Sequence, residues 1–219
     1  MKKLLLGIAA VCLAGFTFAQ DAPLWMRHSV ISPDGTTIAF TYKGDIYTVP
    51  VAGGRAMQIT TNPAYDTAPV WSPDSKRIAF ASDRMGSLDV YIVAKDGGEP
   101  RRLTTHSGSE TPLAFTDAGH VLFSAGIMPS AEAVVFPSNG QFNQVYRVSV
   151  EGGRPTMISS MPMECISINK EGAMLYQDKK GYEDYWRKHH VSPIARDIWM
   201  YTPGKEPQYR QLTTFGGED

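Results

Sequence analysis

Residues 32–61 read SPDGTTIAFTYKGDIYTVPVAGGRAMQITT, and residues 72–105 repeat the same order of features. Each copy begins with a Ser-Pro-Asp turn, continues through an apolar run and an Asp-aromatic segment, and ends with a glycine pair and two threonines. Proline presets φ for a turn, aspartate accepts hydrogen bonds from nearby backbone, and glycine tolerates positive φ. Each copy is therefore expected to fold as short strands joined by tight turns.

The same order of features occurs twice more, in residues 117–160 and 171–214. The aromatic residue that ends the apolar run stands at positions 40, 80, 123 and 176, so its spacing grows from 40 to 43 to 53 residues. The added residues fall between the apolar run and the Asp-aromatic segment, where a loop can lengthen at small entropic cost. Self-similarity at such a period is typical of a β-propeller.

We predict an all-β chain that forms a β-propeller of about four blades, each of four antiparallel strands. The expected partial propeller covers residues 24–219, with blades at about 28–61, 66–105, 110–160 and 164–214. Continuous apolar runs fit strands covered on both faces, and a short, polar-flanked last strand fits an outer edge. Because the sequence stops directly after the fourth copy, we expect an incomplete ring within a larger protein. Its first and last blades should each expose one apolar face.

The repeat also predicts how single side chains are used. Aromatic residues at one equivalent position are expected to pack blade against blade. These residues are Tyr47, Tyr91, Tyr146 and Trp199. Ser75 replaces the glycine of the first turn, which predicts local strain. Cys165 is the only cysteine beyond the first twenty residues, and its isoleucine neighbours Ile166 and Ile168 predict a buried thiol.

Acidic residues open three of the predicted third strands. Asp45, Asp89 and Asp197 recur singly, without the dense spacing that a calcium loop needs, and are expected to accept hydrogen bonds from turn amides. Asp83 and Arg84 are expected to form a weak ion pair within a loop.

The first twenty residues have the composition of an export signal. Lys2 and Lys3 precede an apolar stretch, residues 4–18, that is short for a membrane span, and Ala19 supplies a small residue for cleavage. We predict a signal peptide over residues 1–19 with cleavage near Ala19. The mature protein is then periplasmic or secreted, with no membrane association.

The bulk composition excludes some functions. The chain has 219 residues and a formal net charge of −1, with no strongly basic stretch, so nucleic-acid binding is not expected. It lacks a Gly-x-Ser-x-Gly nucleophile motif. The adjacent His189 and His190 lack the spacing of zinc ligands. We therefore predict no catalytic, cofactor-binding or metal-binding residue within this chain.

One segment has candidate ligand contacts. Residues 186–190 combine a tryptophan with basic side chains, and Arg187 and Lys188 are possible contacts for a peptide, because a guanidinium can hold a carboxylate bidentately. The alternative is a loop that packs on a neighbouring domain.

Three stretches carry a family resemblance. Residues 24–47, the stretch GYEDYWRKHH at 181–190 with residues 196–199, and residues 211–219 resemble tricorn-type serine peptidases. The stretch at 181–190 is the most specific part. The resemblance implies propellers that precede a peptidase part, in which the active-site serine and histidine lie. It therefore implies that this chain serves substrate access, peptide gating and scaffolding, with peptides or proteins as substrates of the parent.

Two alternatives share the repeat. One is a TolB-like periplasmic propeller that binds proteins. The other is the propeller of a prolyl-oligopeptidase-like hydrolase. The resemblance leaves this chain's own enzymatic role open and allows a homo-oligomer for the full-length parent.

Overall fold

The computed structural model describes residues 24–126, 143–161, 163–169, 171–178 and 196–214. Within these ranges it has sixteen β-strands, grouped into four antiparallel sheets of four strands each. The predicted all-β class and incomplete propeller are confirmed. No described residue belongs to a helix with the length and hydropathy needed to cross a bilayer. The predicted signal peptide, residues 1–19, lies outside the described ranges.

Each sheet is one blade, and its strands follow chain order. Blade 1 consists of β1 Arg27–Ile31, β2 Thr37–Tyr42, β3 Asp45–Pro50 and β4 Met57–Gln58. Blade 2 consists of β5 Asp66–Trp71, β6 Arg77–Ser82, β7 Asp89–Ala94 and β8 Arg101–Arg102. Blade 3 consists of β9 Glu110–Asp117, β10 His120–Ala125, β11 Gln144–Ser149 and β12 Thr156–Ser159. Blade 4 consists of β13 Met163–Ile168, β14 Met174–Asp178, β15 Ile198–Thr202 and β16 Gln208–Gln211.

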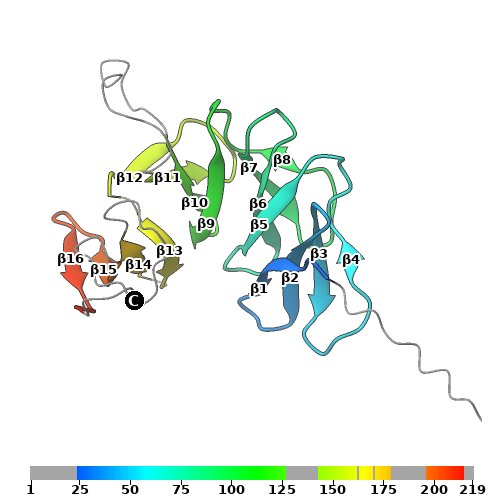
Figure 1. The fold of residues 1–219 in the computed structure, drawn as a ribbon, viewed down its shortest axis with the longest axis horizontal. Coiled ribbons are helices and arrows are strands. Elements are labelled where there is room, and N and C mark those ends of the chain that lie inside the picture. Colours follow the sequence, from blue (N-terminus) through cyan, green and yellow to red (C-terminus); the bar gives the residue numbers. More distant parts are fainter. Residues whose placement is uncertain (1–23, 127–142, 162, 170, 179–195, 215–219) are drawn as a thin grey trace, which may run out of the picture.

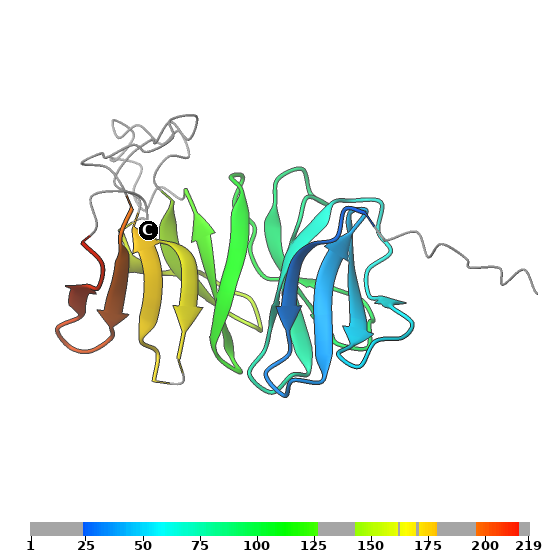
Figure 2. The ribbon, with the colours of Figure 1, turned by 60° about the horizontal axis from the view of Figure 1, so that its bottom comes forward.

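The four blades lie around an open arc (Figure 1). Their first strands, β1, β5, β9 and β13, lie on the inside, and each contacts the first strand of the next blade. The last strands, β4, β8, β12 and β16, lie on the outside, and blades 1 and 4 form the two ends of the arc. Seen from the side, the four sheets lie next to one another with their strands roughly upright (Figure 2). Residues near the inner strands are therefore the ones that can form a shared site.

The Ser-Pro-Asp turns are held by their own side chains. Ser32 Oγ donates to Asp34 Oδ1 over 2.6 Å and accepts from the amide of Thr37 over 3.0 Å. The hydrogen bond from Ser32 is the main cause that lowers the pKa of Asp34. Ser75 has a φ of 57°, so the expected strain is present, and its hydroxyl accepts from the Asp34 amide over 3.1 Å. The serine that strains its own turn thus connects blades 1 and 2.

The threonines that end the repeat connect the outer strand to the third strand. Thr60, Thr104 and Thr213 each accept a hydrogen bond from a backbone amide at the start of the third strand. The donors are Ile46, Val90 and Ile198, at 3.0, 2.9 and 2.9 Å. This clamp explains why a threonine stands at this place in three of the four copies.

Two of the acidic residues that open the third strands, Asp45 and Asp89, have side-chain partners and not turn amides, so the prediction is wrong for these two. Asp45 accepts from the side chains of Gln58 and Thr60, over 3.0 and 3.3 Å. Asp89 lies 2.9 Å from the guanidinium of Arg102. The partners come from the outer strand of the same blade, because antiparallel pairing brings its side chains beside the start of the third strand.

The predicted Asp83–Arg84 pair is also wrong. Arg84 instead forms a largely buried ion pair with Asp66, with 2.7 Å between Nη2 and Oδ2. Its guanidinium lies over the rings of Phe80 and Tyr91, 5.4 and 4.9 Å from their centroids. The long side chain reaches back across the blade because cation–π contact and a buried carboxylate together stabilise it more than an exposed neighbour would.

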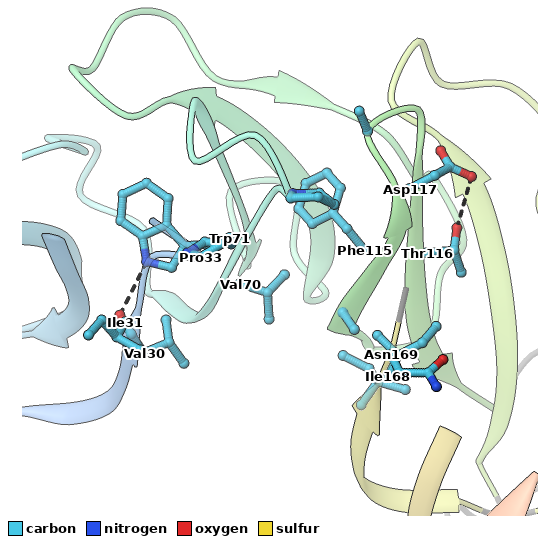
Figure 3. A pocket seen from close by; sticks show the side chains of 14 residues that line it. Val30, Ile31, Pro33, Val70, Trp71, Phe115, Thr116, Asp117, Ile168 and Asn169 are labelled. Atoms are coloured by element: carbon cyan, nitrogen blue, oxygen red, sulfur yellow. Dashed lines mark hydrogen bonds between the residues drawn. The ribbon is translucent and has the colours of Figure 1, made fainter. Parts of the chain in front are cut away.

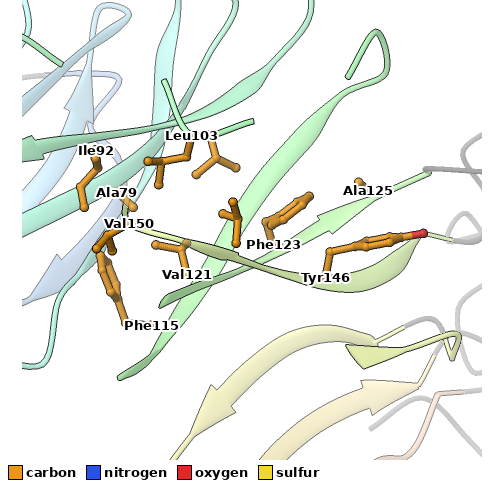
Figure 4. Close-up of a cluster of buried hydrophobic side chains, with 11 residues drawn as sticks. Ala79, Ile92, Leu103, Phe115, Val121, Phe123, Ala125, Tyr146 and Val150 are labelled. Atoms are coloured by element: carbon orange, nitrogen blue, oxygen red, sulfur yellow. The ribbon is translucent and has the colours of Figure 1, made fainter. Parts of the chain in front are cut away.

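The hydrophobic core lies between blades, as the repeat predicts. Phe80 and Tyr91 of blade 2 pack with Ile46 of blade 1, whereas Ala79 and Ile92 pack with blade 3. Figure 4 shows the second of these clusters, in which side chains of blades 2 and 3 meet. Successive strand residues point to opposite faces of a sheet. A blade that lies between two others is therefore apolar on both faces. The prediction that the repeated aromatics pack blade against blade is confirmed for Tyr91 and Tyr146.

Cys165 is exposed, which corrects the expected buried thiol. The pairing of β13 with β14 shifts register between Glu164 and Ser167, and Cys165 has a φ of 52°. A bulge at this point turns the thiol away from the blade, which strand periodicity could not reveal.

Blade 4 exposes an apolar face, as predicted for the end of an open arc. Leu175, Ile198 and Leu212 are 44%, 37% and 42% exposed. Their counterparts in blade 2 are Ala79, Val90 and Leu103, which are at most 3% exposed because blade 3 covers them. An uncovered face of this kind favours self-association.

Replacing Leu175, Ile198 and Leu212 together with threonine should reduce self-association of the chain. Threonine keeps strand propensity and removes apolar surface. Sedimentation velocity over a concentration series measures the change. Met85→Thr is the control, because Met85 is exposed in the β6–β7 turn of blade 2 and not on blade 4; an equal effect of the control would contradict the prediction.

Candidate functional site

The inner strands surround an axial pocket of about 560 Å³, at the end of the blades that carries the Ser-Pro-Asp turns (Figure 3). All four blades contribute to it. The apolar residue that precedes each turn lines the pocket in every blade. These residues are Ile31, Trp71, Phe115 and Ile168. The repeat thus places one large apolar side chain per blade around a common axis.

The wall of the pocket is fixed by the core behind it. Trp71 Nε1 donates to the Val30 carbonyl over 3.2 Å, which sets the indole orientation and joins blades 1 and 2. Phe115 belongs to the buried cluster between blades 2 and 3. Val70 packs against that cluster and also lines the pocket. These side chains form a rigid apolar surface.

Polar groups lie at the edge of the axial pocket, mainly from blade 3. Burial alone would raise the pKa of Asp117, but hydrogen bonds from His120 and the Gly119 amide outweigh it and lower that pKa. His120 Nδ1 lies 3.0 Å from Asp117 Oδ1, and the amide lies 2.6 Å from the same oxygen. Asp117 is therefore a charged group whose carboxylate is held by the turn at the end of its own strand, β9.

The chemistry of the axial pocket is that of binding. An apolar cavity with few polar groups takes apolar side chains of a ligand. Among the residues in the described ranges, no group of three His, Cys, Asp or Glu side chains could hold a metal ion.

The sequence-predicted contacts Arg187 and Lys188 lie outside the described residues, so the structure does not place them. Sequence reasoning missed the axial pocket. The signal was present, because an apolar residue precedes the turn in each copy of the repeat, as Trp71 precedes Ser72.

Four four-stranded blades around an axis, with an apolar pocket at its end, define the chain as a β-propeller with a binding surface. The family match defines the chain more closely than this structural class. Residues 23–219 match the tricorn protease N-terminal beta propeller domain, and the chain belongs to this family.

Similar proteins agree with this assignment. The chain is 25% identical to Tricorn protease homolog 1 of Streptomyces coelicolor over 180 residues, which are 82% of this chain and 16% of that protein. The crystal structure of the tricorn protease has a TM-score of 0.65 at 17% identity, over 90% of this chain and 19% of that one. TolB from Acinetobacter baumannii has a TM-score of 0.62 at 16% identity, over 88% and 45%. The two structures support the fold alone, and the chain spans about a sixth of the Streptomyces protein.

Proposed function

We propose that this chain is the N-terminal propeller part of an exported tricorn-like serine peptidase, where it serves substrate access, peptide gating and scaffolding. The catalytic part of that peptidase lies outside this chain. The family match supports this over the TolB-like and prolyl-oligopeptidase-like alternatives. Export follows from the proposed signal peptide at residues 1–19, with cleavage near Ala19 and a periplasmic or secreted mature protein. Arg187 and Lys188 stay proposed peptide contacts.

The axial pocket is the observation that carries this proposal. It is open, apolar and built from all four blades, so an extended peptide can place apolar side chains in it while its backbone stays in water. Burying apolar surface stabilises such a complex by about 25 cal/mol per Å². The pocket therefore selects peptides with large apolar side chains.

Ile31→Asp should weaken the binding of an apolar peptide by about tenfold, since one lost apolar contact of about 1.4 kcal/mol has that effect. Ile31 lines the axial pocket but is 57% exposed, so the charge should cost little stability. Fluorescence anisotropy of a labelled, amidated peptide with central leucine and phenylalanine residues measures the affinity.

The control is Val51→Asp, which adds the same charge at an exposed apolar residue that does not line the axial pocket. Unchanged peptide affinity in Ile31→Asp, or an equal loss in the control, would remove the support for this proposal.

A further inference from the structure

The axial pocket has one ionisable side chain among the described residues that line it, and this side chain is the acid Asp117. Thr116 and Asn169 are the other polar residues of the lining, and both are uncharged. Figure 3 shows Thr116 and Asp117 across the pocket from Trp71. A ligand in the axial pocket therefore meets a carboxylate at the edge and no basic side chain in the wall.

The Asp117 carboxylate is charged and open to solvent. Burial would raise its pKa, but hydrogen bonds from His120 and the Gly119 amide lower that pKa below its ordinary value. The side chain is 56% exposed. Across the described part of the chain, His120 is the one base that forms an ion pair with Asp117. Because a histidine side chain is mostly neutral at pH 7.5, the negative charge of Asp117 has no lysine or arginine partner.

Two bases lie near this end of the molecule but outside the lining. Arg77 Nη2 donates to the carbonyl of Ala118, the residue after Asp117 in the chain. Arg77 and Lys76 also interact electrostatically with Asp74, the acid of the blade 2 turn. Their charges are thus engaged by groups of the blades, and Asp117 alone gives the axial pocket a charge of its own.

The wall of the axial pocket suits a cation that is attached to an apolar group. Lysine and arginine lay their methylene stems along apolar surface and keep the charge at its edge. The indole N–H of Trp71 is bound to the Val30 carbonyl, so the ring offers a ligand its carbon atoms and π system, which attract a cation. A ligand carboxylate would find no basic partner in the lining and would lie near a like charge.

We propose that the axial pocket selects peptides that carry a positive charge beside a large apolar side chain. The apolar side chain occupies the cavity, and the positive group donates a charge-assisted hydrogen bond to the Asp117 carboxylate. The proposal rests on the proposed peptide-handling function and adds charge selectivity at the same pocket. The positive charge has two possible sources, a basic side chain or the α-amino group of a peptide N-terminus.

Four peptides with one apolar core and a neutral label at an amidated C-terminus separate these sources. One is acetylated and uncharged, one has a free N-terminus, one is acetylated with a single lysine, and one is acetylated with a single glutamate. Anisotropy titrations at pH 7.5 and low salt measure the affinities. The unmodified chain should bind a positively charged peptide about fivefold more tightly than the uncharged one, which is the upper range for an exposed ion pair. The glutamate peptide should bind more weakly than the uncharged one.

Asp117→Asn should remove the charge preference and leave the affinity for the uncharged peptide unchanged, because asparagine keeps the shape and an oxygen for the Gly119 amide. A preference for the lysine peptide alone identifies a basic side chain as the source, and a preference for the free N-terminus alone identifies the α-amino group.

The control is Asp96→Asn, which removes an exposed acid between β7 and β8 that does not line the axial pocket. A preference that persists in Asp117→Asn, an equal loss in Asp96→Asn, or equal affinity of all four peptides for the unmodified chain would overturn the charge selectivity. If Ile31→Asp still weakens the uncharged peptide, the proposed function survives that result. If no peptide binds the unmodified chain, both proposals fail.

Discussion

Leu122→Ala is expected to lower the free energy of unfolding by about 2–5 kcal/mol, the range for leucine truncation in a packed core. Leu122 is fully buried in blade 3 and packs with Met174 and Tyr176 of blade 4. Its truncation leaves a cavity between two blades, and the close-packed sheets have little freedom to close it.

Leu175→Ala is the matched control, because Leu175 occupies the same position of the repeat in blade 4 but is 44% exposed. It should cost less than about 1 kcal/mol. Urea unfolding followed by circular dichroism measures both values, with unchanged m-values as the check that the unfolding transition is the same. Equal losses in the two variants would show that burial between blades does not decide the stability of this repeat position.

The sequence predicts the difference in burial between Leu122 and Leu175 because blade packing is periodic. Positions such as Phe80 and Leu122 recur at fixed places in the repeat, and alternation along a strand decides which neighbour each one meets. The strand order and the interblade aromatics could therefore be predicted without coordinates. Only the number of copies was needed to predict an exposed face on blade 4.

Bulges and long-range side-chain contacts could not be predicted. Cys165 is exposed because a bulge shifts the pairing register of β13 with β14; the same shift occurs in blades 1 and 2, but no shared residue type marks it in the sequence. Arg84 pairs with Asp66 because a long side chain crosses two aromatic rings. Both outcomes depend on three-dimensional reach, which local sequence does not encode.

The candidate pocket illustrates the same limit. The axial pocket combines residues more than a hundred positions apart, such as Ile31 and Ile168, and only the arc brings them together. A repeat shows which residues are equivalent, but the size of a pocket follows from how the blades are placed around the axis.

Two equivalent acids at the start of inner strands differ in their partners. Asp66 opens β5 and pairs with Arg84, which follows β6. Glu110 opens β9, and the sequence has Ile127 at the position that corresponds to Arg84. Glu110 is fully buried, its carboxylate oxygens have no hydrogen bond of good geometry, and the acid Asp89 lies nearby.

Burial is the main cause that raises the pKa of Glu110 from 4.5 to about 7; the charge of Asp89 adds to the rise, and the Thr104 hydroxyl and Arg102 offset only part of it. Because this pKa is higher in the folded state than in the unfolded chain, the folded state binds more protons between pH 4.5 and 7. Stability is therefore lost as the pH rises through this window. A pKa rise of this size corresponds to a loss of about 3 kcal/mol in the free energy of unfolding at pH 8, as an order of magnitude.

Glu110→Gln should remove that loss. Glutamine has the shape of the protonated acid and cannot ionise, so the variant should be more stable than the unmodified chain at pH 8 and similar to it at pH 5. Urea unfolding at half-unit steps from pH 5 to 8 measures the two curves. Glu99→Gln, at an exposed position of blade 2, should keep the slope of the unmodified chain. Parallel curves for Glu110→Gln and the unmodified chain would show that Glu110 does not bind the proton, because the slope reports protons taken up on folding.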